Sequence, residues 1–246
     1  MTQARFKIWR GDKDGGGYQE YSTEVSEGMV VLDAVHQIQA ESANDLAVRW
    51  NCKAGKCGSC SAEINGKPRL MCMTRLSDLP LDEGTTIEPM KTFPLQKDLV
   101  TDVSWNYRVK EKIKKFTPRP ADAEDGTWRV DTMDTERVQE FRKCIECYLC
   151  QDVCHVLRDH ALHNEFIGPR FFTYTAALEM HPIDGERRTR ELKEDFGVGY
   201  CNITKCCTKV CPEGITITDN AIIPLKERVA DDFYDPIKRL WRKLKR

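Results

Sequence analysis

Residues 52–60 read Cys-Lys-Ala-Gly-Lys-Cys-Gly-Ser-Cys, and a fourth cysteine stands at position 72. This spacing, C-x4-C-x2-C-x11-C, is typical of plant-type [2Fe–2S] sites. Gly55 and Gly58 allow the backbone to wrap closely around a cluster and to aim N–H groups at its sulfurs. The stretch therefore predicts a [2Fe–2S] site. Its expected ligands are Cys52, Cys57, Cys60 and Cys72.

Two more groups of cysteines lie in the second half of the chain. Residues 144–154 read Cys-Ile-Glu-Cys-Tyr-Leu-Cys-Gln-Asp-Val-Cys, and residues 201–212 read Cys-Asn-Ile-Thr-Lys-Cys-Cys-Thr-Lys-Val-Cys-Pro. The first run has the C-x2-C-x2-C-x3-C spacing of two-cluster ferredoxins, in which the fourth cysteine binds the other cluster. This rule predicts a [4Fe–4S] site. Its expected ligands are Cys144, Cys147, Cys150 and Cys211.

The remaining cluster site has fewer thiolates. Thr204 stands where a second cysteine of the third group is expected. The three thiolates that remain favour a three-iron [3Fe–4S] cluster, and they belong to Cys154, Cys201 and Cys207. Cys206 is interpreted as an idle buried thiol that points elsewhere, and a role as a ligand is the alternative.

A disulfide framework and structural zinc are the alternative explanations for twelve cysteines. Disulfide frameworks are typical of short secreted chains, whereas this chain has 246 residues and its first ten lack the apolar core of a signal peptide. Zinc usually combines two separated C-x2-C pairs in one tetrahedron, whereas here three cysteines recur at i, i+3 and i+6. Because both ferredoxin spacings occur together, iron–sulfur clusters are favoured.

Composition limits the function classes. The formal net charge is −1, which provides no electrostatic footprint for nucleic acid, so no nucleic-acid partner is expected. No stretch approaches the roughly 18 consecutive apolar residues of a membrane span. The sequence therefore predicts a soluble or peripheral protein.

The apolar pattern changes along the chain and predicts two domains, 1–104 and 105–246. In the first, strands are expected around Phe6 and Ile8 and over 18–25, with a helix over 30–40. The Asn65-Gly66 turn signal predicts a hairpin that returns the chain towards Cys72.

The second half has a helical pattern. The segment 110–128 is interpreted as the connection between the domains, because it contains a basic run, two prolines and an acidic stretch. Helices are then expected over 135–143, 170–181, 185–195 and 220–246.

Taken in order, the three cysteine groups closely resemble those of the iron–sulfur subunits of succinate dehydrogenases and fumarate reductases, over nearly the whole chain. The resemblance implies an α+β fold, with an amino-terminal β-grasp plant-type ferredoxin domain and an all-α bacterial-ferredoxin-like domain. It also implies an electron-transfer subunit of a succinate:quinone oxidoreductase. Electrons would pass between a flavin (FAD) in a separate flavoprotein and a membrane quinone, through the [2Fe–2S], [4Fe–4S] and [3Fe–4S] clusters in turn.

The same resemblance implies partners and a location. The flavoprotein would perform the dicarboxylate chemistry, so no catalytic residue is expected here. Membrane-anchor subunits would hold the complex at the cytoplasmic face of the bacterial plasma membrane, with quinone near the [3Fe–4S] cluster. Many family members have a histidine and a tryptophan beside the quinone where this chain has Asn202 and Asp159, so a quinone pocket is not carried over.

The carboxyl-terminal tail has its own pattern. Apolar residues recur at i, i+3, i+4 and i+7 over 237–244, interleaved with lysines and arginines. This pattern predicts a short basic amphipathic helix suited to an anionic membrane surface or an anchor subunit. A terminal helix that packs on its own domain is the alternative.

Two other functions are compatible with the cysteine pattern. One is the iron–sulfur subunit of a fumarate reductase with another electron donor, such as a thiol- or heterodisulfide-linked enzyme. The other is a free multi-cluster ferredoxin carrier.

Overall fold

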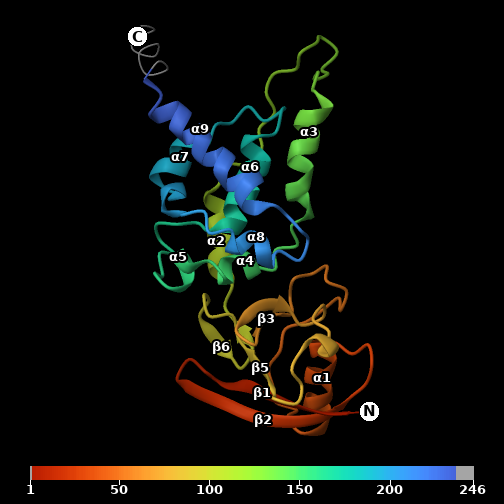
Figure 1. The fold of residues 1–246 in the computed structure, drawn as a ribbon. Coiled ribbons are helices and arrows are strands. Elements are labelled where there is room, and N and C mark those ends of the chain that lie inside the picture. Colours follow the sequence, from red (N-terminus) through yellow and green to blue (C-terminus); the bar gives the residue numbers. More distant parts are fainter. Residues whose placement is uncertain (1, 237–246) are drawn as a thin grey trace. The chain divides into compact units, whose positions relative to one another are not determined.

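The computed structural model describes residues 2–236 (Figure 1). Its chain divides into two compact units. The first comprises residues up to Trp105 together with Ile145–Val153 and Val210–Pro212. The second comprises Asn106–Cys144, Cys154–Lys209 and the chain from Glu213 onward. The domain ranges 1–104 and 105–246 stay predictions, and the tail helix predicted over 237–244 lies outside the described residues.

The first unit is built on a mixed β-sheet. Across the described residues the sheet has seven strands, in the order β4-β3-β5-β1-β6-β7, with β2 paired to β1. The strands are β1 (Thr2–Asp12), β2 (Gly15–Val25), β3 (Ser61–Ile64), β4 (Lys67–Leu70), β5 (Thr85–Glu88), β6 (Leu95–Lys97) and β7 (Val100–Thr101). Strand β1 runs antiparallel to β2 and parallel to β5. Helix α1 (Val31–Glu41) lies beside this sheet (Figure 1).

The alternation predicted for the first strand is confirmed. Ala4, Phe6 and Ile8 are fully buried, and the residues between them are exposed. This period of two is what a strand with one covered face produces. Helix α1 adds Leu32 and Val35, also fully buried, to the same hydrophobic core.

The predicted hairpin is also confirmed. Asn65 and Gly66 both have positive φ, 49° and 70°, as a type I′ turn requires. The turn joins β3 to β4 in an antiparallel pair. After β4, the Met71 N–H donates to the Cys60 carbonyl at 3.0 Å, which places Cys72 beside the end of the first cysteine loop.

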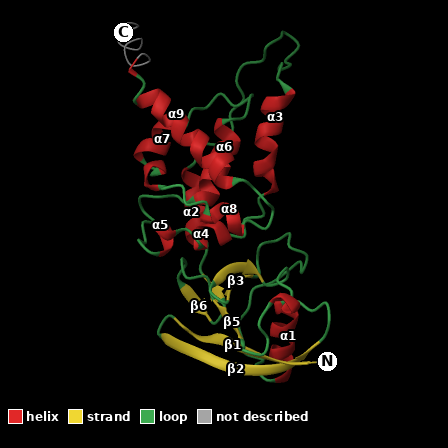
Figure 2. Cartoon of the chain, in the orientation of Figure 1, coloured by secondary structure: helices red, strands yellow, loops and turns green. Residues whose placement is uncertain are grey.

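Helices dominate the second half of the chain, and together with the amino-terminal sheet they give the α+β fold that the sequence predicted (Figure 2). The α-helices are α2 (Ser104–Lys112), α3 (Thr132–Gln139), α4 (Leu149–Asp152), α5 (His155–Arg158), α6 (Pro169–Glu179), α7 (Thr189–Glu194), α8 (Cys206–Val210) and α9 (Ile223–Phe233). Shorter 3-10 turns span Leu76–Asp78, Glu140–Lys143 and Val198–Tyr200, and a π-helical turn, Ile217–Ile222, leads into α9. None of the helices within residues 2–236 combines the length and apolar character needed to cross a membrane.

Helix α6 lies at the centre of the second unit, in contact with α3, α9 and the π-helical turn. Its Phe171, Phe172 and Ala176 are at most 1% exposed. The π-helical turn contributes Ala221 and Ile222, both fully buried, to the core of this unit. Burial of this apolar surface is the main force that holds the short helices together.

Helix α7 begins at Thr189, four residues later than the pattern predicted. The cause is Arg188, whose side chain is fully buried. Its guanidinium bonds Asp184 at 2.8 Å and the carbonyls of Lys114 and Lys115 at 2.9 Å. A buried guanidinium requires such partners, and the backbone on its amino-terminal side is not helical.

The segment interpreted as a connection between domains, 110–128, belongs to the second unit. Helix α2 extends through Lys112, and the chain beyond it pairs with the loop after α6. The Gly185 N–H donates to Thr117 O, and the Arg119 N–H donates to Ile183 O, both at 2.8 Å.

Candidate iron–sulfur cluster sites

The first unit brings together the four cysteines predicted to hold a [2Fe–2S] cluster. Cys52, Cys57 and Cys60 belong to the loop between α1 and β3, and Cys72 follows β4. Hydrogen bonds link Cys52 to Cys57, and Cys60 interacts electrostatically with both Cys57 and Cys72. The Cys72 N–H donates to Cys60 Sγ at 3.5 Å.

Backbone N–H groups in this loop point at sulfur. Those of Ala54 and Lys56 both donate to Cys52 Sγ at 3.4 Å. The loop can turn its amides inward because Lys53 and Gly55 have left-handed conformations, with φ of 53° and 66°. Such bonds stabilise a thiolate, which is the form that binds iron.

The thiols differ in their acidity. Burial acts to raise the pKa of Cys57, but hydrogen bonds from Ser59 and Cys52 outweigh it and lower the pKa to about 6. Burial raises the pKa of Cys60 to about 12. A buried thiol of this kind loses its proton on binding a metal. The donor set and the inward amides therefore fit a [2Fe–2S] cluster.

The first cysteine loop packs directly against the second. A methyl group at Gly58 would lie 2.7 Å from Cys147 Cα and 2.9 Å from the Cys147 amide nitrogen. Ser61 Oγ lies 3.0 Å from the Gly58 carbonyl oxygen and 2.8 Å from the Cys147 carbonyl oxygen. Only glycine allows this backbone approach, and one buried hydroxyl joins the two loops.

The segment Ile145–Val153 is anchored to the first unit by two further contacts. Thr92 donates its N–H to Asp152 Oδ1 and its hydroxyl to the Asp152 carbonyl, both at 3.1 Å. The rings of Phe93 and Tyr148 meet edge to face, with centroids 6.1 Å apart. These contacts fix the loop that carries Cys147 and Cys150.

The second and third cysteine loops repeat one backbone conformation. In the second, Glu146 and Tyr148 have φ of 55° and 61°; in the third, Ile203 and Lys205 have φ of 62° and 61°. Both pairs stand two and four residues after the first cysteine of their group. A short helix then begins five residues after that cysteine in each loop.

This repeat aligns the two groups position by position. Cys201 corresponds to Cys144, Thr204 to Cys147 and Cys207 to Cys150. Cys206 then corresponds to Leu149, which is 1% exposed and packs in the core of the first unit. The structure thus places Thr204, rather than another residue, at the position of the second cysteine.

The position and burial of Cys206 differ from those that the sequence led us to expect. It is half-buried, and its Sγ lies 3.3 Å from Thr204 Oγ1. It also hydrogen-bonds with Cys207 and His155, and it interacts electrostatically with Cys154. The expectation of a buried thiol that points elsewhere is wrong: Cys206 shares the surroundings of the third site.

Several residues around the third site carry no sequence signal. The Cys207 sulfur lies 3.4 Å from Thr218 Oγ1, and the Thr208 hydroxyl donates to the same oxygen at 3.1 Å. Lys226 donates to the Cys201 carbonyl at 2.5 Å. No spacing rule points to these hydroxyls or to the lysine, because they reach the cysteines from the π-helical turn, α8 and α9.

The remaining ligand candidates lie in both units: Cys211 in the first, and Cys144, Cys154 and Cys201 in the second. No disulfide joins any of the twelve cysteines, all of which are among the described residues. Within 2–236, no three His, Cys, Asp or Glu side chains gather around one metal-ion position. The two residues that depart from the family pattern, Asn202 and Asp159, are both exposed.

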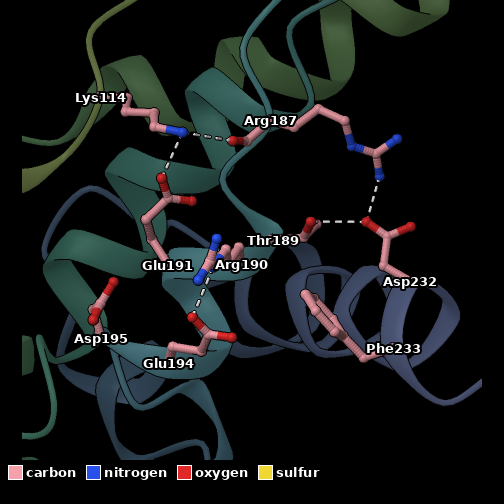
Figure 3. Close-up of a pocket in the computed structure, with 9 residues that line it drawn as sticks. All are labelled: Lys114, Arg187, Thr189, Arg190, Glu191, Glu194, Asp195, Asp232 and Phe233. Atoms are coloured by element: carbon pink, nitrogen blue, oxygen red, sulfur yellow. Dashed lines mark hydrogen bonds and ion pairs between the residues drawn. The ribbon is translucent and has the colours of Figure 1, made fainter.

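A cavity of about 600 Å³ opens elsewhere in the second unit (Figure 3). Its three cationic side chains are ion-paired: Lys114 with Glu191 at 2.5 Å, Arg187 with Asp232 at 2.6 Å, and Arg190 with Glu194 at 2.8 Å. Each cation that lines the cavity therefore has an acidic partner on the same wall.

Two family models match the chain. Residues 5–107 match a 2Fe-2S iron-sulfur cluster binding domain, and residues 140–215 match a 4Fe-4S dicluster domain. Together with the cysteine loops, these matches define an iron–sulfur electron-transfer protein.

Relatives specify the family. The fumarate reductase iron-sulfur subunit of Mycobacterium tuberculosis is 31% identical over 202 residues, 80% of each chain. A subunit of the fumarate reductase (CoM/CoB) of Methanothermobacter marburgensis is 29% identical over 219 residues, 89% of this chain and 42% of that protein. A chain of the Mycobacterium smegmatis Sdh1 complex in the apo form is 59% identical, with a TM-score of 0.91, and the match covers 96% of this chain and 98% of that chain. The protein belongs to the family of iron–sulfur subunits of succinate dehydrogenases and fumarate reductases, and is thus a subunit of an oxidoreductase.

Proposed function

We propose that this chain relays electrons between a flavin in a separate flavoprotein subunit and a membrane quinone. The carriers are a [2Fe–2S], a [4Fe–4S] and a [3Fe–4S] cluster, in that order. The observation that carries the proposal is the contact of Gly58 with the Cys147 backbone, bridged by Ser61. Because the two cysteine loops touch, electrons need cross only a short distance between the first two clusters.

The ligand sets follow from the loops. Cys52, Cys57, Cys60 and Cys72 hold the [2Fe–2S] cluster. Cys144, Cys147, Cys150 and Cys211 hold the [4Fe–4S] cluster. Cys154, Cys201 and Cys207 hold the [3Fe–4S] cluster, and the alignment of Thr204 with Cys147 supports three thiolates there.

The proposal includes partners and location. The flavoprotein carries FAD and performs the succinate–fumarate chemistry, and membrane-anchor subunits bind the complex at the cytoplasmic face of the bacterial plasma membrane. The M. smegmatis structure that matches this chain is described as a complex, which supports this assembly. Quinone is expected near the [3Fe–4S] cluster, without a role assigned to Asn202 or Asp159.

The test is a redox titration of the purified complex, monitored by EPR. Three distinct cluster signals are expected, and succinate should reduce at least the cluster of highest potential. Addition of quinone should then reoxidise that cluster. Succinate-reduced clusters that stay reduced when quinone is added would contradict the quinone-linked function.

A fumarate reductase with a thiol donor is the second candidate, favoured by the similarity to the CoM/CoB fumarate reductase. This function predicts that thiols, rather than a quinol, reduce the clusters in the same titration. A free multi-cluster carrier is the third candidate, and it predicts purification of this chain without a flavoprotein.

A further inference from the structure

The third cysteine loop contains a thiol that the proposed ligand sets do not use. Cys206 Sγ lies 3.3 Å from the hydroxyl of Thr204, which holds the place of the missing fourth ligand. The two residues are adjacent because α8 begins at Cys206, directly after the left-handed Lys205. The position that lacks a cysteine ligand, Thr204, and the unused thiol of Cys206 are therefore neighbours.

The surroundings of Cys206 connect it to the same site. It hydrogen-bonds with Cys207 and interacts electrostatically with Cys154, and both are proposed ligands of the three-iron cluster. Thr204 is exposed and Cys206 is only half-buried, so an ion from solvent can approach this corner. Thiolate sulfur is a far better iron ligand than a neutral hydroxyl.

We propose that Cys206 is a reserve ligand, which captures a fourth iron and converts the [3Fe–4S] cluster into a [4Fe–4S] cluster. This inference rests on the proposed three-iron assignment. The one-electron-reduced cluster, [3Fe–4S]0, takes up one Fe2+ while Cys206 releases its thiol proton to solvent. The Cys206 sulfur bonds to the incoming iron, and the product core is [4Fe–4S]2+, with no other electron required.

The fourth iron is held less firmly than the other three. In the repeated loop conformation Cys206 corresponds to Leu149, which is not a ligand position, whereas Thr204 corresponds to the ligand Cys147. Cys206 therefore replaces the absent ligand from a neighbouring position. One-electron oxidation of the product, with the quinone of the proposed function as the electron acceptor, releases Fe2+, returns a proton to the Cys206 sulfur and restores [3Fe–4S]+. This corner therefore responds to iron and to the redox state.

The test uses the intact complex, reduced with dithionite and incubated anaerobically with iron-57 Fe2+. Mössbauer spectra of this sample show whether the added iron joins a cluster. A parallel sample receives no iron and is mildly oxidised, and its EPR spectrum measures the three-iron signal. The wild type should incorporate about one added iron per chain into a [4Fe–4S] cluster. Cys206→Ser should keep the three-iron signal and incorporate none. Thr204→Val, which removes the hydroxyl at an exposed position, should behave like the wild type.

The outcomes separate the hypotheses. Three results would each overturn the reserve-ligand role. The first is equal iron uptake by the wild type and Cys206→Ser, and the second is loss of uptake only in Thr204→Val. The third is no uptake by the wild type. A wild type without any three-iron signal before iron is added would instead reject the [3Fe–4S] assignment, and this inference with it.

Discussion

Thr204 takes the backbone position that Cys147 takes in the second loop, and it offers a hydroxyl and a methyl group where Cys147 offers a thiol. Thr204→Cys restores C-x2-C-x2-C-x3-C in the third group. We expect the variant to assemble [4Fe–4S] in place of [3Fe–4S], because a thiolate now holds the fourth iron. The oxidised three-iron EPR signal should disappear, one iron per chain should be gained and the potential of this cluster should fall. A three-iron signal at wild-type intensity would show that the alignment of the loops is wrong.

Thr218 is expected to tune the potential of the third cluster. Its oxygen already accepts the Thr208 hydroxyl proton, so its own proton is directed at the Cys207 sulfur. Hydrogen bonds to ligand sulfur stabilise the reduced cluster. Thr218→Val should therefore lower the midpoint potential, by on the order of 20–60 mV if the bond contributes about 0.5–1.5 kcal/mol.

EPR-monitored titration measures the shift in Thr218→Val. The matched control is Thr218→Ser, which keeps the hydroxyl and should retain a potential close to that of the wild type. Equal shifts in the two variants would attribute the effect to packing of the buried side chain.

Among the structural elements, the joined loops around Gly58 are the most sensitive to added volume. Gly58→Ala adds a methyl group 2.7 Å from Cys147 Cα at a position with φ of 67°. We expect about 1–2 kcal/mol of backbone strain and a further cost of roughly 1–3 kcal/mol from the clash. The thermal midpoint for loss of cluster absorbance in the complex should fall.

Gly66→Ala is the matched control for this change. Gly66 has a similar φ of 70°, but a methyl group there meets no atom within 4 Å. It should therefore show the backbone strain without the clash. If the two variants lose the same stability, the contact with Cys147 has no energetic role.

The same elements show what sequence patterns can predict. Alternation around Phe6 and Ile8 and the Asn65-Gly66 turn were sufficient to predict the first strand and the hairpin, because both signals are local in the sequence. The positions of Cys206, Thr218 and Ser61 were not predictable, since each depends on which elements meet in three dimensions. Arg188 is a similar case, because its bonds to buried partners delay the start of the predicted helix to Thr189.

For the whole molecule, the three cluster assignments predict the iron content. If every site is filled, each chain should contain about nine iron atoms. Elemental analysis of the anaerobically purified complex measures this number. Abundant zinc with little iron would reject the iron–sulfur interpretation of all three loops.

The proposed attachment of the complex to a membrane can be tested through the basic tail of this chain. Removal of residues 236–246 deletes the predicted amphipathic helix and should release the subunit from membranes at lower salt, because clustered lysines and arginines contribute about 1 kcal/mol each near anionic lipid. Cluster absorbance should be preserved. Unchanged retention across a salt series would favour a tail that packs on its own domain.

The anchoring of Ile145–Val153 to the first unit also has a consequence for synthesis and inheritance. Domains tend to fold in order as they leave the ribosome, yet Gly58 and Thr92 must wait for partners that are translated more than fifty residues later. The amino-terminal half thus reaches its final packing only after the chain up to Asp152 has emerged. Recombination between the genes of two relatives, at a point between the two halves, would combine Gly58 and Thr92 from one parent with their contact partners from the other. We therefore expect the two halves to be inherited together from one parent.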